Sequence, residues 1–183
     1  MTAAVVLAAG PSTRLGEPKQ LVMVGRETLL ERSVRAAREA GCETVVVVLG
    51  AEVERILERC NLTGAVVVVN DAWEEGMASS IRVGVGAVGG ADGVLLMTCD
   101  QPAVTAEHLL ALMAAGEVTA SAYAGRRGVP AYFPAASFPA LRALRGDAGA
   151  RELLREAGTV DLVGGELDVD TDADRAAAVK LFG

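Results

Sequence analysis

A glycine-containing polar stretch near the start of the sequence carries the first residues suited to chemistry. Gly10 and Gly16 let a ligand approach the backbone closely, so that successive N–H groups can surround phosphate oxygens. Arg14 and Lys19 add positive charge at this place in a chain whose formal net charge is −7. Five residues separate the two glycines and Glu17 follows the second, which differs from a Walker A motif. The stretch therefore predicts a phosphate site of another kind.

A single carboxylate, Asp100, follows an apolar segment and is followed in turn by Pro102. We expect it at the end of a buried strand, where its backbone is rigid. Mg²⁺ takes one or two protein oxygens and completes its shell with water and substrate phosphates, so this position suits it. The alternative is that Asp100 caps the next helix, but Thr105 is better placed to do so. We therefore expect metal or phosphate chemistry at Asp100, with Mg²⁺ as the cofactor.

A third group of carboxylates, Asp168, Asp170 and Asp172, lies near the end of the chain. Alternation along a strand places the first two on one face, where both can point at one cation. The other interpretation is that Thr171 or Asp172 caps the last helix and the remaining carboxylates form a solvated edge. The residues alone leave both interpretations open.

Two further candidates are weaker. Gly84, Gly86 and Gly89 form a literal GxGxxG, but they lie inside a predicted helix and far beyond the preceding strand. We interpret them as glycines that let a helix pack closely. His108, the one histidine, lies in an ordinary predicted helix, and we assign it no role.

Apolar runs alternate with amphipathic segments, which predicts βαβ units and a mostly parallel sheet. The expected strands are Ala3–Ala8, Thr44–Leu49, Ala65–Val69 and Gly93–Cys99, and the expected helices Thr28–Ala40, Ala51–Cys60, Met77–Val88 and Thr105–Ala115. Shorter segments follow at Thr119–Ala124, Gly128–Phe133 and Thr159–Val169, with helices at Ser137–Leu144, Ala148–Ala157 and Asp172–Leu181. We expect a three-layer α/β fold with helices on both faces of a twisted sheet. Ligands bind beyond the carboxyl ends of such strands, which gathers the polar loop, Asn70–Ser80, Asp100 and Asp168–Asp170 at one edge.

Length and composition limit the class of protein. A chain of 183 residues predicts one domain, with its first hundred residues as a nucleotide-type half. The negative net charge and an aromatic content of 3% argue against nucleic acid as a partner. No apolar run approaches the roughly 20 residues of a membrane span, and no basic segment precedes the first apolar run. We expect a cytoplasmic protein without a membrane partner, and a monomer because no dimerisation arm is evident.

Six motifs together resemble small nucleotidyltransferases related to the molybdenum cofactor cytidylyltransferases, the MobA-like group. They are LAAGPSTRLGEPKQL (Leu7–Leu21), VVVNDAWEEGMASSIRVG (Val67–Gly84), LLMTCDQP (Leu95–Pro102), YAGRRGVPAYF (Tyr123–Phe133), GDAGAR (Gly146–Arg151) and DVDTDAD (Asp168–Asp174). The first motif alone indicates only the Rossmann-like nucleotide-diphospho-sugar transferase type of fold. The combination is much more specific and covers nearly the whole chain.

This resemblance implies a role for each matching residue. The implied catalytic residues are Arg14, Lys19 and Asp100, with Asp100 and Asp170 on Mg²⁺. The implied nucleotide-binding residues are Leu7, Ala8, Ala9, Gly10, Arg14, Lys19, Gly76, Met77, Ser80 and Asp100, and Gly128 and Pro130 line the acceptor side. The resemblance thereby implies a nucleotide-binding half at residues 1–102 and an acceptor-binding half at residues 103–183. Arg126 and Arg127 either meet the acceptor's phosphate or are exposed loop arginines.

The reaction that the resemblance implies is transfer of CMP from CTP to the phosphate of a molybdopterin-type acceptor, with release of pyrophosphate. Related guanylyltransferases tend to carry LAGG where this chain has LAAG, so Ala9 favours CTP over GTP. A molybdenum hydroxylase apoenzyme or its chaperone is the implied protein partner. The alternatives are a guanylyltransferase, a sugar-phosphate nucleotidyltransferase and, from a different class, a non-catalytic nucleotide-binding module.

Overall fold

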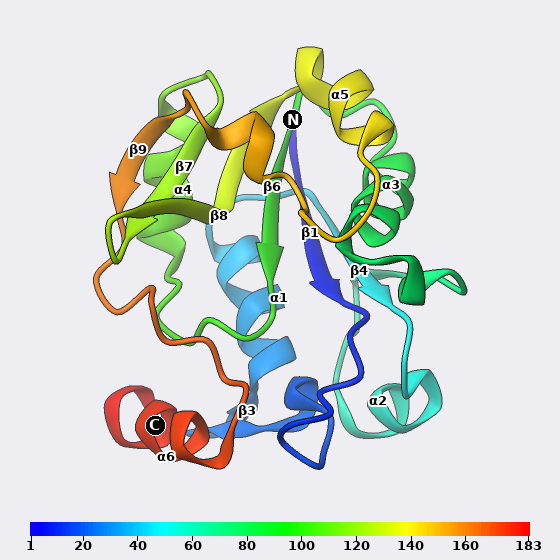
Figure 1. Cartoon of the computed structure of the whole chain (residues 1–183), viewed down its shortest axis with the longest axis vertical. Coiled ribbons are helices and arrows are strands. Elements are labelled where there is room, and N and C mark those ends of the chain that lie inside the picture. The colour runs from blue at the N-terminus through cyan, green and yellow to red at the C-terminus, as the bar shows by residue number, and fades with distance from the viewer.

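The β-branched runs form the centre of a seven-stranded sheet in the computed structural model, which describes residues 1–183 (Figure 1). Its strands are β1 (Thr2–Ala8), β4 (Thr44–Leu49), β5 (Val66–Val69), β6 (Gly93–Thr98), β7 (Thr119–Tyr123), β8 (Arg126–Pro134) and β9 (Gly158–Asp161). Their order is β5-β4-β1-β6-β8-β7-β9, and only β8 runs antiparallel to its neighbours. The predicted α/β fold with a mostly parallel sheet is confirmed. A separate two-stranded hairpin joins β2 (Met23–Val24) to β3 (Glu27–Thr28).

Six α-helices surround the sheet, and threonines begin three of them. The helices are α1 (Leu29–Glu39), α2 (Val53–Arg59), α3 (Met77–Ala87), α4 (Ala106–Ala114), α5 (Phe138–Ala143) and α6 (Asp172–Phe182). Thr28, Thr105 and Thr171 are N-caps whose side chains accept a hydrogen bond from the first turn. Because Thr105 caps α4, Asp100 is not needed for capping. None of the helices combines the length and apolar character that a membrane-spanning segment requires.

Side chains alternate across the sheet and fill two apolar layers. Ala4, Val6 and Ala8 of β1 pack in the layer that holds Leu30 of α1 and Ile56 of α2, together with residues of α4. Ala3, Val5 and Leu7 of the same strand face the layer under α3 and α5. A Cβ atom added to Gly84 would collide with Val5, so α3 packs closely against β1 at this glycine. This contact agrees with a packing role for the GxGxxG sequence.

A small third core joins the polar loop to the end of the chain. Leu15 and Val22 pack there against Val169 and Ala178 of the C-terminal segment. The carboxyl ends of β1 and β6 point toward the end of the molecule where α6 and β3 lie (Figure 1). An ion pair of 2.7 Å between Arg175 Nη1 and Glu17 Oε1 adds a polar contact between α6 and the loop. The last helix thus packs beside the edge of the sheet where ligands are expected.

Two predicted elements after Gly116 are wrong in their extent. The final strand β9 stops at Asp161, so Asp168–Asp170 lie outside any strand. The predicted helix Ala148–Ala157 is only a 3-10 turn over Arg151–Leu154. Gly149 precedes this turn with a φ of +59°, a left-handed conformation that an α-helix cannot include. Both segments are irregular, and both contribute to the site described next.

Candidate active site

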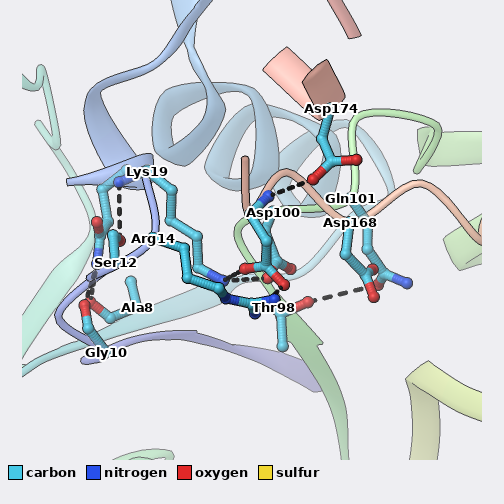
Figure 2. Close-up of polar contacts among 12 residues, drawn as sticks. Ala8, Gly10, Ser12, Arg14, Lys19, Thr98, Asp100, Gln101, Asp168 and Asp174 are labelled. Carbon is cyan, nitrogen blue, oxygen red and sulfur yellow. Dashed lines mark hydrogen bonds and ion pairs between the residues drawn. The ribbon is translucent and has the colours of Figure 1, made fainter. Parts of the chain in front are cut away.

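The Lys19 ammonium lies between two carboxylates from distant parts of the chain. Its Nζ atom is 2.5 Å from Asp100 Oδ2 and 3.1 Å from Asp170 Oδ1. Lys19 begins the 3-10 turn η1 (Lys19–Leu21), and Asp100 follows β6 by two residues. Figure 2 shows Lys19 and Arg14 reaching toward Asp100 from the same side. Burial alone would lower the pKa of Lys19, but the two carboxylates outweigh it and raise that pKa, so the ammonium stays charged.

A backbone hydrogen bond brings Asp170 to this place. Val169 is fully buried, and its N–H donates to the Asp100 carbonyl at 2.9 Å. Asp170 therefore stands beside Asp100, and its Oδ2 accepts from Arg14 Nη2 at 2.8 Å. Arg14, Lys19, Asp100 and Asp170 form one cluster of two cations and two anions, which we call the charge cluster.

Asp168 faces a different partner, so of the two interpretations left open, the structure does not support the one in which it and Asp170 point at one cation. Its Oδ2 lies 3.9 Å from Arg126 Nη2. Burial, and then the negative charge of Asp100, raises the pKa of Asp168 to about 6, while Arg126 opposes this shift. No group of three or more acidic, histidine or cysteine side chains is arranged to hold a metal ion. The two carboxylates on Lys19 are the candidates.

Asp100 and Asp170 fit a divalent cation by the chemistry of their donors. Their oxygens converge on one positive group, the ammonium of Lys19. Mg²⁺ is commonly held by one or two carboxylates together with substrate phosphates, and two suffice. The residues present therefore suit a metal that arrives with a phosphorylated ligand.

The glycine-containing loop is held from inside by the residues that follow it. Gln20 Nε2 donates to the carbonyls of Ala8 at 2.7 Å and Gly10 at 3.2 Å. The Lys19 N–H donates to Ser12 Oγ at 2.9 Å. The sequence pattern gives no signal for Gln20, which is fully buried although glutamine is usually exposed.

A first cavity of about 490 Å³ opens beside this loop. It is lined by all the predicted nucleotide-binding residues except Arg14, namely Leu7, Ala8, Ala9, Gly10, Lys19, Gly76, Met77, Ser80 and Asp100. Sequence analysis did not single out Trp73 and Asp147, which also line it. Trp73 is the only tryptophan of the chain, a signal that could have drawn attention to it. Asp147 comes from residues 103–183, so the two predicted halves overlap at this wall.

A second cavity of about 740 Å³ lies on the other side of Asp100. Met77, Thr98 and Asp100 line both cavities, so the two spaces meet at these residues. Four arginines line the second cavity, namely Arg126, Arg127, Arg151 and Arg155. Two of them pair with carboxylates that line the same cavity, Arg126 with Asp168 and Arg155 with Glu152, whereas Arg127 and Arg151 make no ion pair.

The two residues predicted for the acceptor side differ in placement. Gly128 lines the second cavity, as expected. Pro130 does not; it is buried, and its carbonyl accepts from Ser121 Oγ at 2.6 Å. At its position in β8, Pro130 faces the core and not the cavity.

Groups that serve as nucleophiles or bases in other enzymes are unsuited to such a role here. Burial raises the pKa of the Cys99 thiol to about 12. His108 Nε2 lies 2.7 Å from the buried Ser121 Oγ, and burial lowers the pKa of this histidine. The charge cluster is therefore the chemical centre of the site.

The sequence profile of the MobA-like NTP transferase domain family matches residues 4–161. A protein of Paenarthrobacter nicotinovorans named nicotine blue oxidoreductase is 37% identical over 83% of this chain and 80% of its own length. The purine catabolism protein PucB of Bacillus subtilis is 32% identical over 82% of this chain and 79% of its own.

Solved structures extend the similarity to the whole fold. Rv0371c of Mycobacterium tuberculosis H37Rv has a TM-score of 0.86 at 34% identity, covering 98% of this chain and 97% of that one. A further structure of Rv0371c, in complex with manganese, has a TM-score of 0.81 at 32% identity, covering 98% of each chain.

Proposed function

The chain belongs to the MobA-like NTP transferase family, and we propose that it transfers CMP from CTP to the phosphate of a molybdopterin-type acceptor carrying molybdenum. The observation that carries this proposal is the meeting of two cavities at Asp100. Lys19, whose ammonium contacts Asp100, lines the first of them. A group transfer between two bound molecules needs two binding sites that adjoin where the new bond forms and the old bond breaks.

The reaction moves one nucleotidyl group. An oxygen of the acceptor phosphate attacks the α-phosphorus of CTP, and the bond between that phosphorus and the oxygen bridging to the β-phosphate breaks. Pyrophosphate leaves with the bonding electrons. A phosphate monoester is already an anion near neutral pH, so no general base is required. The absence of a reactive cysteine or histidine near the cluster agrees with this chemistry.

The charge cluster supports the reaction by binding and by neutralising charge. Backbone N–H groups of the loop would hold the phosphates, and Lys19 and Arg14 would bind the oxygens on which negative charge grows. Asp100 and Asp170 would hold a divalent cation such as Mg²⁺, which when bound supplies Lewis-acid polarisation of phosphate oxygens. The manganese in the complex of Rv0371c supports a divalent cation for this family.

The second cavity suits an anionic acceptor. The Arg127 side chain is held in place because its Nε donates to the Ala157 carbonyl at 3.0 Å. Its terminal nitrogens are free to bind an anion. Arg151 lines the same space. These side chains, together with the family motifs, support a large phosphorylated acceptor such as molybdopterin.

The experiment measures pyrophosphate release with each of the four nucleoside triphosphates and Mg²⁺, with and without the molybdopterin acceptor. We expect release with CTP only when the acceptor is present. Preference for GTP would replace the proposal by guanylyl transfer. Release with a sugar phosphate would redirect it to that acceptor class, and binding without turnover would indicate a non-catalytic module.

A redox function is a second candidate because of one observation, the 37% identity to a protein named as an oxidoreductase. The charge cluster contains no redox-active group, so an electron donor would have to bind in one of the cavities. The same preparation is therefore tested for oxidation of a reduced nicotinamide cofactor by nicotine blue. Dye reduction without triphosphate-dependent pyrophosphate release would favour this second function.

A further inference from the structure

Gln20 occupies an unusual position at the wall of the first cavity. It is fully buried, and its Oε1 is a buried oxygen with no hydrogen-bond partner. Buried acceptors without a donor are rare in folded proteins and call for an explanation. The explanation lies on the other side of the same amide, where both bonds of Nε2 go to carbonyls of the loop. A flipped amide would set Oε1 against those two carbonyl oxygens, so the orientation is fixed.

The loop carbonyls determine where the loop N–H groups point. In a trans peptide the carbonyl and the next N–H point in opposite directions. The Ala8 carbonyl accepts from Gln20, so the Ala9 N–H points away from Gln20. The Ala9 carbonyl accepts from the Ala51 N–H at 2.9 Å, so the Gly10 N–H points away from Ala51. Neither of these two N–H groups donates a hydrogen bond within the chain, and both residues line the first cavity.

We propose that Gln20 is a positioning residue for the nucleotide: its bond to the Ala8 carbonyl keeps the Ala9 N–H directed at the phosphates, and its bond to the Gly10 carbonyl fixes the far end of the segment whose Gly10 N–H is oriented by the contact with Ala51. Gln20 itself acts through the loop and contacts no reacting atom. The unpartnered Oε1 follows from committing both amide hydrogens to the loop. This inference rests on the proposed function, because it takes the first cavity to be the nucleotide site.

The test compares two variants with one control by calorimetric titration of CTP and Mg²⁺ without acceptor. Gln20→Met keeps the length of the side chain and removes both bonds, and we expect the CTP dissociation constant to rise about tenfold. Gln20→Glu places a carboxylate against two carbonyl oxygens, so its effect should be larger. Ser121→Ala removes another fully buried donor to a backbone carbonyl, that of Pro130, and Ser121 lines neither cavity. It should lower the melting temperature and leave CTP affinity within about twofold.

A second measurement on the unaltered protein covers variants that fail to fold. Amide hydrogen exchange followed by NMR should show slow exchange of the Gln20 side-chain protons. The Ala9 and Gly10 amides should exchange quickly in the free protein and slowly after CTP is added. Fast exchange of the Gln20 protons, or a Gln20→Met variant with unchanged CTP affinity, overturns the inference. If the unaltered protein binds no nucleoside triphosphate, the proposed function fails first, whatever the Gln20 protons show.

Discussion

The two cavities that meet at Asp100 are built in different ways. The first is walled by backbone at the end of β1 and by a loop that Gln20 and Ser12 hold in shape. The second is walled by β7–β8 and a 3-10 turn, with long arginine side chains supplying its charge. A site made of backbone fits what all nucleoside triphosphates share, whereas long side chains on irregular segments can change with the acceptor. Under the proposed function, this difference predicts a constant donor site beside an adaptable acceptor site.

The substitution with the largest expected effect removes the residue that both cavities share. Asp100→Asn should lower turnover by about 10³-fold, because metal binding and alignment of both substrates depend on this carboxylate. Steady-state pyrophosphate release measures the loss, and circular dichroism checks that the fold is kept. Turnover near that of the unaltered enzyme would mean that the junction is not the reaction centre.

Lys19→Met should change the interaction with CTP and leave the binding of the acceptor unchanged. We expect kcat/KM for CTP to fall by at least ~10²-fold, the scale for losing one transition-state donor. The KM for the acceptor should change little, since Lys19 lines only the first cavity. A rise in the KM for the acceptor as large as that for CTP would contradict the separation into two sites.

Lys19→Met is expected to lower activity with CTP but to raise the affinity for a divalent cation. In the free protein Lys19 contacts both candidate metal ligands, so a cation arriving alone must displace its ammonium. Lys19→Met should therefore bind Mn²⁺ about tenfold more tightly when nucleotide is absent, as electron paramagnetic resonance can measure. In the unaltered protein, nucleotide phosphates give Lys19 a new partner, so nucleotide and metal should strengthen each other's binding reciprocally. Metal affinity that is independent of nucleotide would argue against this exchange.

The smallest effect is expected on the acceptor side. Arg127→Ala should raise the KM for the acceptor roughly three- to tenfold and leave that for CTP unchanged, because several arginines share the charge. Arg38→Ala is the matched control, since Arg38 also donates to a backbone carbonyl, that of Thr63, but lines neither cavity. An altered CTP affinity in Arg127→Ala would contradict the assignment of the two cavities to different substrates.

The parts of the molecule that sequence predicts well are those fixed by local patterns. β1, β4 and β6 are continuous apolar runs buried on both faces, and such runs are typical of parallel strands. The N-caps at Thr105 and Thr171 follow from the same kind of local rule. The rule that ligands gather at the carboxyl edge then brings Lys19 and Asp100 together, which the structure bears out.

The parts that sequence does not predict depend on contacts between distant residues. Alternation fails at Asp168 and Asp170 because a single bond from Val169 to the Asp100 carbonyl, not a strand ladder, sets their directions. The buried amide of Gln20 depends on carbonyls that turn inward only after the loop has folded. Arg151 belongs to a segment with a helical pattern that a left-handed glycine interrupts.

The position of Asp170 in the chain also bears on how the protein is made. The ribosome adds Asp170 long after it has made the strands up to β6. A growing polypeptide therefore holds Lys19 and Asp100 before Asp170 is present. The core formed by Leu15, Val22, Val169 and Ala178 closes only after α6 has left the ribosome. Under the proposed function, the site is thus completed only after Asp170 and α6 have been made, and chains that stop before Asp170 should not transfer the nucleotide.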